Sequence, residues 1–473
     1  MKLVYNVTDN PRNSSMKFGQ MIIFAVQQLL AIMAATLVVP VITNGNAKLT
    51  GSEAMSPAAA LFGAGIGTLV YVLFTKAKSP VFLGSSFAFL GSMAAAFSGA
   101  ISVSAGYLGL IIGAVMAGLV YVVIAIAVKI GGVKWINKLM PPVVIGPVVA
   151  LIGLSLASNA VSDLQTAPAG GSTFIAILCG LVTLAVIVIC STFGKKKGFY
   201  RLIPFIIGIL AGYAVAAIFT VIGNATDIDS LKVIDFSPFT ALLTDGHVTV
   251  KTFFSIPDFT FLTAAKGFDG IDAQYIATLA IAYVPVAFVV FAEHIADHKN
   301  ISYIIEKDLL EEPGLHRTLL GDGVGSMVGA FFGGCPNTTY GESIGCVAIT
   351  GNASVCTIAT AAVEAMIIAF LSPFVAFVNS IPSCVMGGVC MALYGFIAVS
   401  GLKMVQDVDL GKNRNLFVVS VILISGIGGL QITIGKITIT TIAVALILGI
   451  LTNLLLHKKD KNTDETPENQ VIK

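Results

Sequence analysis

Apolar runs of about 20 residues recur along the whole chain, and this repetition limits the possible folds more than any other feature. A run of that length can cross a hydrocarbon core of roughly 30 Å as a helix. Only 11% of the 473 residues are charged, whereas a soluble protein carries roughly a quarter. Because a bilayer offers no hydrogen bonds to the backbone, spanning segments are helical except where they line a cavity. The sequence therefore predicts an all-α polytopic membrane protein.

The apolar runs divide into fourteen predicted transmembrane segments. An even number of crossings returns the chain to its starting side, so both termini are expected on the same side of the membrane. The predicted segments cover residues 18–42, 56–75, 81–99, 106–129, 141–158, 172–193, 202–222, 274–305, 317–335, 337–351, 353–372, 382–401, 415–434 and 437–456.

Basic residues are concentrated in alternate loops between these segments, and this pattern orients the chain. Short loops rich in Lys and Arg mark the cytoplasmic side, so both termini and the polar tail 457–473 are predicted to be cytoplasmic. The long connection 223–273 carries seven Asp against three Lys and is predicted to be extracellular. The basic residues are Lys76, Lys78, Lys129, Lys134, Lys138, Lys195, Lys196, Lys197, Arg201, Lys403, Lys412, Arg414, Lys458, Lys459 and Lys461.

The chain also shows signs of two related halves. MPPVVIG at 140–146 has a counterpart in IPSCVMG at 381–387, and each opens a Gly-rich segment. Because each half has seven segments, the second copy must enter the membrane from the opposite side. This arrangement is a 7+7 inverted repeat, with halves at 18–222 and 274–456 separated by the extracellular loop 223–273.

The third segment of each half is short and contains Gly. LGSSFAF at 83–89 and NTTYGES at 337–343 open the segments 81–99 and 337–351 with small polar residues. Such segments at matching positions of two halves indicate the midplane site of a transporter. Their backbone N–H groups can face a ligand, because irregular backbone survives at membrane depth only where it lines a cavity.

Acidic side chains at membrane depth lie in the stretch 288–351. Glu293 and Asp297 are four residues apart and share one face of a predicted helix. Glu342 follows in the second Gly-containing element. Charges at this depth are costly and are functional candidates by default. A carboxyl group that takes up and loses a proton inside a cavity is the simplest proton-coupling device.

A second interpretation of the same stretch belongs to another class of protein. His294-x-x-Asp297-His298 resembles the H-x-x-E-H pattern of inverted zinc peptidases, which would make the chain an intramembrane zinc metalloenzyme. The transporter interpretation is preferred because the acid is Asp, no third ligand is apparent and an inverted repeat would have no purpose in an enzyme. Asp322, in Gly-Asp-Gly, is expected to be a cap or loop group.

Four longer stretches are similar to the nucleobase–ascorbate transporter family, and specifically to its bacterial uracil permeases: PVFLGSSFAFL, AEHIADHKN, KDLLEEPGLHRTLLGDG and FFGGCPNTTYGESIGCVAIT. The resemblance covers essentially the whole chain. It implies a core domain (18–129 plus 274–372) and a gate domain (141–222 plus 382–456). It also implies that segments 3 and 10 begin as short antiparallel strands that meet at the substrate, that transport is coupled to protons, and that the protein is a homodimer.

The resemblance also implies which residues bind the substrate. The family's substrate glutamates correspond to Glu293 and Glu342, and the backbone amides that contact the base correspond to Phe87 and Gly341. Glutamate at position 342 is similar to the uracil branch, whereas purine carriers typically have Gln there. The ring of Tyr340 is expected to add contacts to the base.

The sequence departs from the family pattern at four positions. Gln28 stands where many members have His, and Asp297 where some members have His. The candidates for proton coupling are therefore Glu293, Asp297 and Gln28. Ser343, a further candidate for substrate binding, replaces the usual Asn, and Gly351 replaces a basic residue.

The chemistry of uracil suits such a site. Its flat, uncharged ring offers two N–H donors and two carbonyl acceptors, which carboxylates and free backbone amides can match. We therefore expect a proton-coupled importer of uracil in the plasma membrane that works by alternating access. Apart from the lipid bilayer and a second copy of the chain, no partner, enzymatic activity, cofactor, metal or nucleic acid is expected. A purine (xanthine or urate) permease is the alternative within the class.

Overall fold

The computed structural model describes residues 3–13, 16–132, 141–168, 170–193, 200, 203–243, 247–406, 408–434 and 437–463. The predicted cytoplasmic loops with Lys134, Lys138, Lys195, Lys196, Lys197 and Arg201 lie outside the described residues. So does the tail from residue 464 onward, whereas residues 457–463 continue the last helix.

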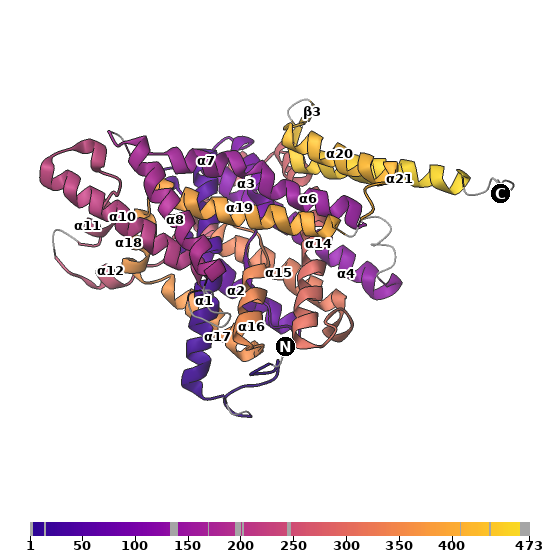
Figure 1. Ribbon diagram of the computed structural model, residues 1–473, viewed down its shortest axis with the longest axis horizontal. Helices are drawn as coiled ribbons and strands as arrows, with labels where there is room; N and C mark the ends of the chain where they lie inside the picture. Colours follow the sequence, from indigo (N-terminus) through magenta and orange to yellow (C-terminus); the bar gives the residue numbers. More distant parts are fainter. Residues whose placement is uncertain are drawn as a thin grey trace.

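Helices fill the first half of the chain apart from one short strand (Figure 1). Its elements are α1 (Phe18–Ala47), η1 (Gly51–Glu53), α2 (Pro57–Phe74), β1 (Leu83–Ser85), η2 (Phe87–Phe89), α3 (Leu90–Ser98), α4 (Val103–Gly131), α6 (Pro142–Ser155), α7 (Ala157–Gln165), α8 (Thr173–Phe193) and α10 (Pro204–Thr226).

The predicted extracellular connection is partly ordered into short turns of helix. They are η3 (Asp229–Leu231), α11 (Ser237–Thr240), α12 (Val250–Phe253), α13 (Thr260–Ala264) and η4 (Phe268–Gly270).

The second half repeats the order of long helix, strand and short helix seen in the first. Its elements are α14 (Ala273–Ile305), η5 (Leu310–Gly314), α15 (Leu315–Gly333), β2 (Asn337–Thr339), α16 (Gly341–Thr350), α17 (Val355–Ile368), α18 (Ser372–Ser380), α19 (Ser383–Val405), α20 (Asn413–Ile427), β3 (Ile432–Ile434), β4 (Ile437–Ile439) and α21 (Thr441–Thr463).

Eight helical stretches of the described chain are long and apolar enough to cross a membrane. They are Phe18–Ala47, Gly51–Phe74, Val103–Gly131, Pro142–Gln165, Thr173–Phe193, Pro204–Thr226, Ala273–Ile305 and Ser383–Val405. Shorter apolar helices occupy other predicted segments, among them Val355–Ile368 and Asn413–Ile427. The chain is thus a mostly helical, multi-pass membrane protein, as its composition predicts.

Local sequence signals set where several of these helices begin. Ser56 caps α2 by accepting a hydrogen bond from Ala59 N, and Pro57 follows at the first helical position. Asp272 caps α14, with Oδ1 2.6 Å from Tyr275 N. Side-chain oxygens at this position satisfy backbone N–H groups that have no partner within the helix.

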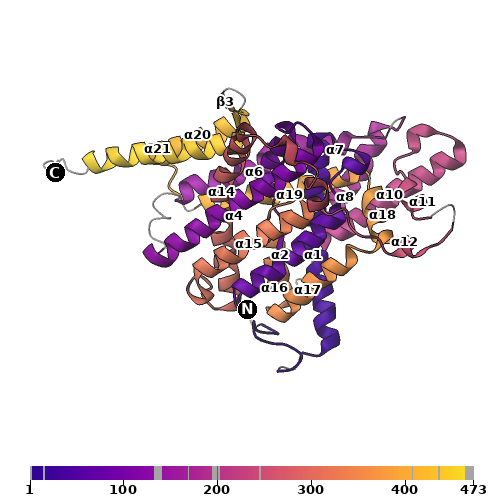
Figure 2. The same ribbon diagram turned by 180° about the vertical axis from the view of Figure 1, so that it is seen from behind.

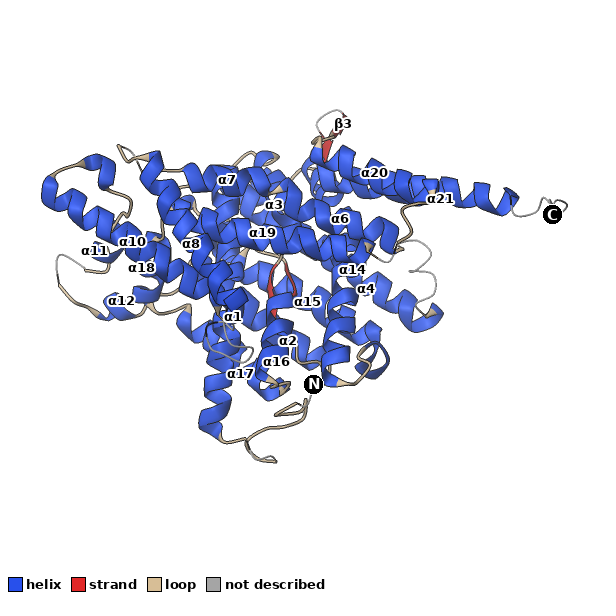
Figure 3. Cartoon of the chain, viewed as in Figure 1, coloured by secondary structure: helices blue, strands red, loops and turns tan. Residues whose placement is uncertain are grey.

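Two three-residue strands pair near the middle of the molecule, where helices enclose them (Figure 3). β1 and β2 are antiparallel, with Gly84 opposite Thr338. Two backbone hydrogen bonds extend the pair, from Tyr340 N to Phe82 O at 3.2 Å and from Ser86 N to Pro336 O at 2.9 Å. The prediction of short antiparallel strands in segments 3 and 10 is confirmed.

The strand pair requires Gly at position 84. A Cβ built there would lie 2.4 Å from ring atoms of Tyr340. The ring cannot easily move, because its hydroxyl donates a hydrogen bond to Ser85 O at 2.6 Å. The ring of Tyr340 from the second half of the chain therefore packs directly on the backbone of Gly84 in the first half.

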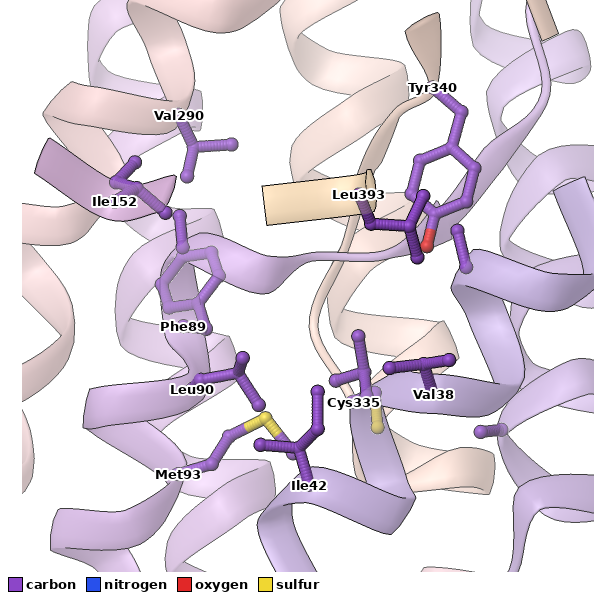
Figure 4. Close-up of a cluster of buried hydrophobic side chains, with 14 of the residues drawn as sticks. Val38, Ile42, Phe89, Leu90, Met93, Ile152, Val290, Cys335, Tyr340 and Leu393 are labelled. Atoms are coloured by element: carbon purple, nitrogen blue, oxygen red, sulfur yellow. The ribbon is translucent and has the colours of Figure 1, made fainter. Parts of the chain in front are cut away.

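Close helix packing surrounds the strands. α2 lies against α15 and α17, α4 against α14 and α15, and α6 against α19. Side chains from α1, α3, α6, α14 and α19 gather in one buried apolar cluster (Figure 4). The members labelled there are Val38, Ile42, Phe89, Leu90, Met93, Ile152, Val290, Cys335, Tyr340 and Leu393.

Two features of the fold were not predicted. The boundary between the last two segments holds a hairpin of β3 and β4, with Thr433 opposite Thr438. The fifth predicted segment is divided between α6 and α7 at Leu156.

α20 and α21 project from the other helices and carry the C-terminus outward (Figures 1 and 2).

The contact at Gly84 predicts a loss of stability in Gly84→Ala. Overpacking of this kind costs about 1–3 kcal/mol, so the variant should unfold at a lower temperature in detergent. Gly91→Ala is the matched control, because nothing lies within 4 Å of a Cβ at Gly91. Equal melting temperatures for the two variants would contradict the close approach of Tyr340.

Candidate functional site

A cavity of about 490 Å³ brings together the acidic residues singled out in the sequence. It is lined by Glu293 and Asp297 from α14 and by Gly341 and Glu342 from α16. Helices α1, α6, α8, α10 and α19 supply most of the other lining residues, which are largely apolar. The predicted convergence of segments 8 and 10 at one site is therefore present.

A smaller cavity of about 50 Å³ shares lining residues with this space and with a second large cavity. Glu293, Gly341 and Glu342 line both the small cavity and the first cavity. On its other side, the small cavity shares Phe87 and other residues with a second cavity of about 510 Å³. The acids thus lie where the small cavity adjoins the first cavity.

The strand pair delivers two helix N-termini to the small cavity. β1 leads into η2, which begins at Phe87, and β2 leads into α16, which begins at Gly341. As the first residues of their helices, Phe87 and Gly341 have N–H groups with no partner inside the helix. These groups can bind a carbonyl or an anion.

Glu293 and Glu342 are half-buried and face this space without a counter-ion. None of the salt bridges found among the described residues involves either carboxylate. Glu342 lies in the first turn of α16, where the helix dipole favours negative charge. Both carboxylates can therefore accept hydrogen bonds from the donors of a ligand.

Asp297 is also at the cavity but has a protein partner. Thr339 Oγ1 donates a hydrogen bond to its Oδ2 at 2.7 Å, and 8% of the residue is exposed. This bond links α14 to the end of β2. A change at Asp297 can therefore act directly on the strand that precedes Glu342.

Gln28 and Ser343 form a link behind the cavity wall. The Gln28 amide donates to Ser343 Oγ, which also accepts a hydrogen bond from Phe82 N at 3.0 Å. Neither residue lines the three cavities described above. The roles predicted for Gln28 in proton coupling and for Ser343 in substrate binding stay predictions. Tyr340, in contrast, lines the small cavity.

Asp322 is a member of this polar region, and its assignment as a cap or loop group was wrong. It lies within α15, is 1% exposed, and its Oδ2 is 2.7 Å from His294 Nδ1. The other ring nitrogen of His294 is 3.0 Å from Thr318 Oγ1. The rule that charge at membrane depth is functional or paired identifies Asp322 when it is applied to Gly-Asp-Gly.

His298 is occupied in a similar way. Its Nδ1 donates to the carbonyl oxygen of His294 at 2.8 Å, and its Nε2 is 2.7 Å from the Tyr71 hydroxyl. All four ring nitrogens of the two histidines thus have protein partners. In the described part of the chain, no group of three or more His, Cys, Asp or Glu residues could hold a metal ion. The zinc-peptidase interpretation of His294, Asp297 and His298 has no support in this geometry.

Comparison with known proteins identifies relatives along nearly the whole chain. Residues 19–435 match the sequence model Xan_ur_permease, described as a permease family. The uracil permease of Bacillus caldolyticus is 38% identical over 458 residues, which are 96% of this chain and 95% of that protein. The uracil permease of Bacillus subtilis (strain 168) is 38% identical over 457 residues, or 95% of each chain.

A solved structure with little sequence similarity has the same fold. The transmembrane domain of the cyanobacterium bicarbonate transporter BicA superposes with a TM-score of 0.58 at 14% identity, covering 93% of this chain and 98% of that one. At this identity the likeness concerns the fold alone. It agrees with a helical membrane architecture interrupted by a short pair of strands.

The contrast between paired and unpaired acids predicts opposite effects on stability. Asp322→Asn disturbs the buried hydrogen bond to His294 and should cost about 1–3 kcal/mol of unfolding free energy, because a buried polar group left without its partner costs that much. Glu293→Gln removes a half-buried carboxylate without a counter-ion and should leave stability unchanged or raised. Thermal unfolding in detergent measures both variants. A melting temperature as low for Glu293→Gln as for Asp322→Asn would contradict this assignment of partners.

Proposed function

Because the chain belongs to the permease family whose model it matches over residues 19–435, we propose that it is a proton-coupled symporter that imports uracil. The chain is a nucleobase transporter and not an enzyme, so the alternative of a zinc metalloenzyme is wrong. The substrate and the coupling ion are our proposal. Relatives of about two fifths identity over nearly the full length are uracil permeases, which favours uracil over the purine alternative, xanthine or urate.

The pairing of two free carboxylates with two helix N-termini in one cavity carries this proposal. Uracil presents N–H groups, and Glu293 and Glu342 can accept hydrogen bonds from them. Its carbonyl oxygens can accept from the backbone N–H groups of Phe87 and Gly341. A buried site built for one hydrogen-bond pattern rejects molecules that leave its groups unpaired. The ring of Tyr340, at the same cavity, adds a flat apolar surface.

We assign the coupled proton to the acids of α14. Glu293 lines the first cavity and the small cavity. Asp297 joins the wall of the first cavity to β2 through its hydrogen bond with Thr339. A proton on Glu293 gives it a donor as well as an acceptor for the imide edge of uracil. Proton and uracil then stabilise the same occupied state, and each raises the affinity for the other equally.

The proposed transport cycle is a movement of a core domain against a gate domain. In this proposal the chain crosses the membrane fourteen times as a 7+7 inverted repeat. The core domain comprises 18–129 and 274–372, and the gate domain comprises 141–222 and 382–456. The small cavity supports alternating access, because residues of both proposed domains line it and each large cavity shares part of that lining.

The remaining parts of the proposal concern the cellular setting. We place the protein in the plasma membrane as a homodimer, with both termini and the basic loops in the cytoplasm and the connection 223–273 outside. Helices of suitable length and the alternation of basic loops support this orientation.

Uptake of radiolabelled uracil by proteoliposomes tests the proposal directly. With a more acidic outer solution, the protein should concentrate uracil inside, and a protonophore should abolish the gradient. Uracil that only equilibrates would contradict proton coupling. Uptake of xanthine without uracil would favour the purine alternative.

In the same assay, Asp297→Asn should keep exchange between equal pools of uracil but lose accumulation. Wild-type accumulation by this variant would exclude Asp297 as a proton carrier.

The contact between Glu342 and the base predicts weaker binding in Glu342→Gln. The replacement keeps the size of the side chain but removes a charge-assisted hydrogen bond, which contributes roughly 1.5–3 kcal/mol. Calorimetry should therefore give an affinity for uracil that is lower by about one to two decades. Glu364→Gln, a matched change on α17 that lines none of the three cavities, should bind uracil as the wild type does. Unchanged binding by Glu342→Gln would remove Glu342 from the site.

A further inference from the structure

A separate cavity of about 300 Å³ lies on the outer side of the bundle, between the ends of α2, α4 and α15. These three helices pack side by side (Figure 2). The cavity shares no residue with the three spaces around the acids. It is lined by Phe74, Ala125, Ile126, Lys129, His316, Arg317 and Leu320.

One part of this lining is basic. Lys129 lies in the last turn of α4, and His316 and Arg317 lie in the first turn of α15. No salt bridge involving any of them is found among the described residues. The positive end of the α15 dipole lies at the same place. The positive charges of Lys129 and Arg317 therefore converge here, and no acid of the described chain forms an ion pair with either of them.

The nearest acid in the sequence is already paired. Glu312, just before α15, forms an ion pair with Lys78 at the end of α2. Hydrogen bonding from Lys78 holds the pKa of the Glu312 carboxyl below its usual value, so Glu312 is ionised and its charge is matched by Lys78. The basic side chains of the cavity therefore remain available to an external anion.

The other part of the lining is apolar and continues onto the surface. Phe74, Leu320 and Ile126 face the cavity, and Ile126 is 52% exposed. Exposed apolar side chains continue along the same helix at the spacing of one face. They are Val115, Leu119, Val123, Ile126 and Ile130. In a membrane protein such a face contacts the acyl chains of lipids.

We propose that this cavity binds one anionic phospholipid. The phosphate lies between Lys129, His316 and Arg317, and an acyl chain runs along α4 past Ile126. Basic pockets between membrane helices on the cytoplasmic side suit anionic headgroups, and Lys76, Lys78 and Lys129 mark this end of the helices as the basic one. A free phosphate would use the basic side chains but leave the apolar wall without a ligand.

Binding is measured by native mass spectrometry of the full chain in detergent, with phosphatidylglycerol as the probe. Phosphatidylcholine of the same chains tests the headgroup, and inorganic phosphate in a parallel melting assay tests the acyl chain. The variant is Lys129→Gln with Arg317→Gln. The matched control is the double variant Lys403→Gln with Lys412→Gln. It also removes two basic residues, but neither of them lines the cavity.

Wild type and control should retain one phosphatidylglycerol that phosphatidylcholine does not replace, and the lipid should raise the melting temperature of both. Loss of two cations should weaken binding about 30-fold, because each contributes about fivefold. Equal retention by the variant and the control would overturn the site. Stabilisation by inorganic phosphate as large as that by the lipid would overturn the assignment to a phospholipid. Both readouts are independent of uracil transport.

Discussion

The pairing of β1 with β2 is the interaction on which the rest of the site depends. At membrane depth an extended backbone cannot bond to water, so these strands survive only because each satisfies the other. Their register is fixed by the close contact of Gly84 with the ring of Tyr340. Because the strands are antiparallel, η2 and α16 begin at opposite ends of the pair. Their N-termini both face the same cavity, which neither half of the chain could form alone.

Hydrogen bonds from the surrounding helices hold this strand pair in place. Asp297 on α14 bonds Thr339 at the end of β2. Gln28 on α1 bonds Ser343, which in turn accepts from Phe82 next to β1. The acids left without such partners, Glu293 and Glu342, are those that face the cavity. A polar group that holds the structure thus lies next to one that faces the cavity. Ser343 directly follows Glu342, and Asp297 lies about one helix turn after Glu293.

Much of this could be predicted from the sequence, because length and polarity report directly on membrane crossing. The apolar runs located the helices, and Gly with small polar residues at 83–89 and 337–343 located the strands. Asp322 was missed because Gly-Asp-Gly is typical of a turn, and only three-dimensional packing shows His294 beside it. The hairpin of β3 and β4 was missed because its alternating Ile and Thr are as apolar as the helices that flank it. Sequence spacing also cannot show that Gln28 and Ser343 bond each other across 315 positions.

α15 connects several features of the molecule that lie in different regions. Arg317 in its first turn lines the basic cavity on the outer side of the bundle. Asp322, a little more than one turn later, bonds His294 on α14, and the helix ends four residues before β2 begins. Gly329 on its inner face lies against Gly63 of α2, where a Cβ would meet backbone at 2.5 Å. α15 is thus packed closely against α2 and the strands, and the bond between Asp322 and His294 joins it to α14. In the proposed transport cycle α2, α14, α15 and both strands belong to the core domain, so the proposed lipid site and the proposed substrate site lie on the same domain.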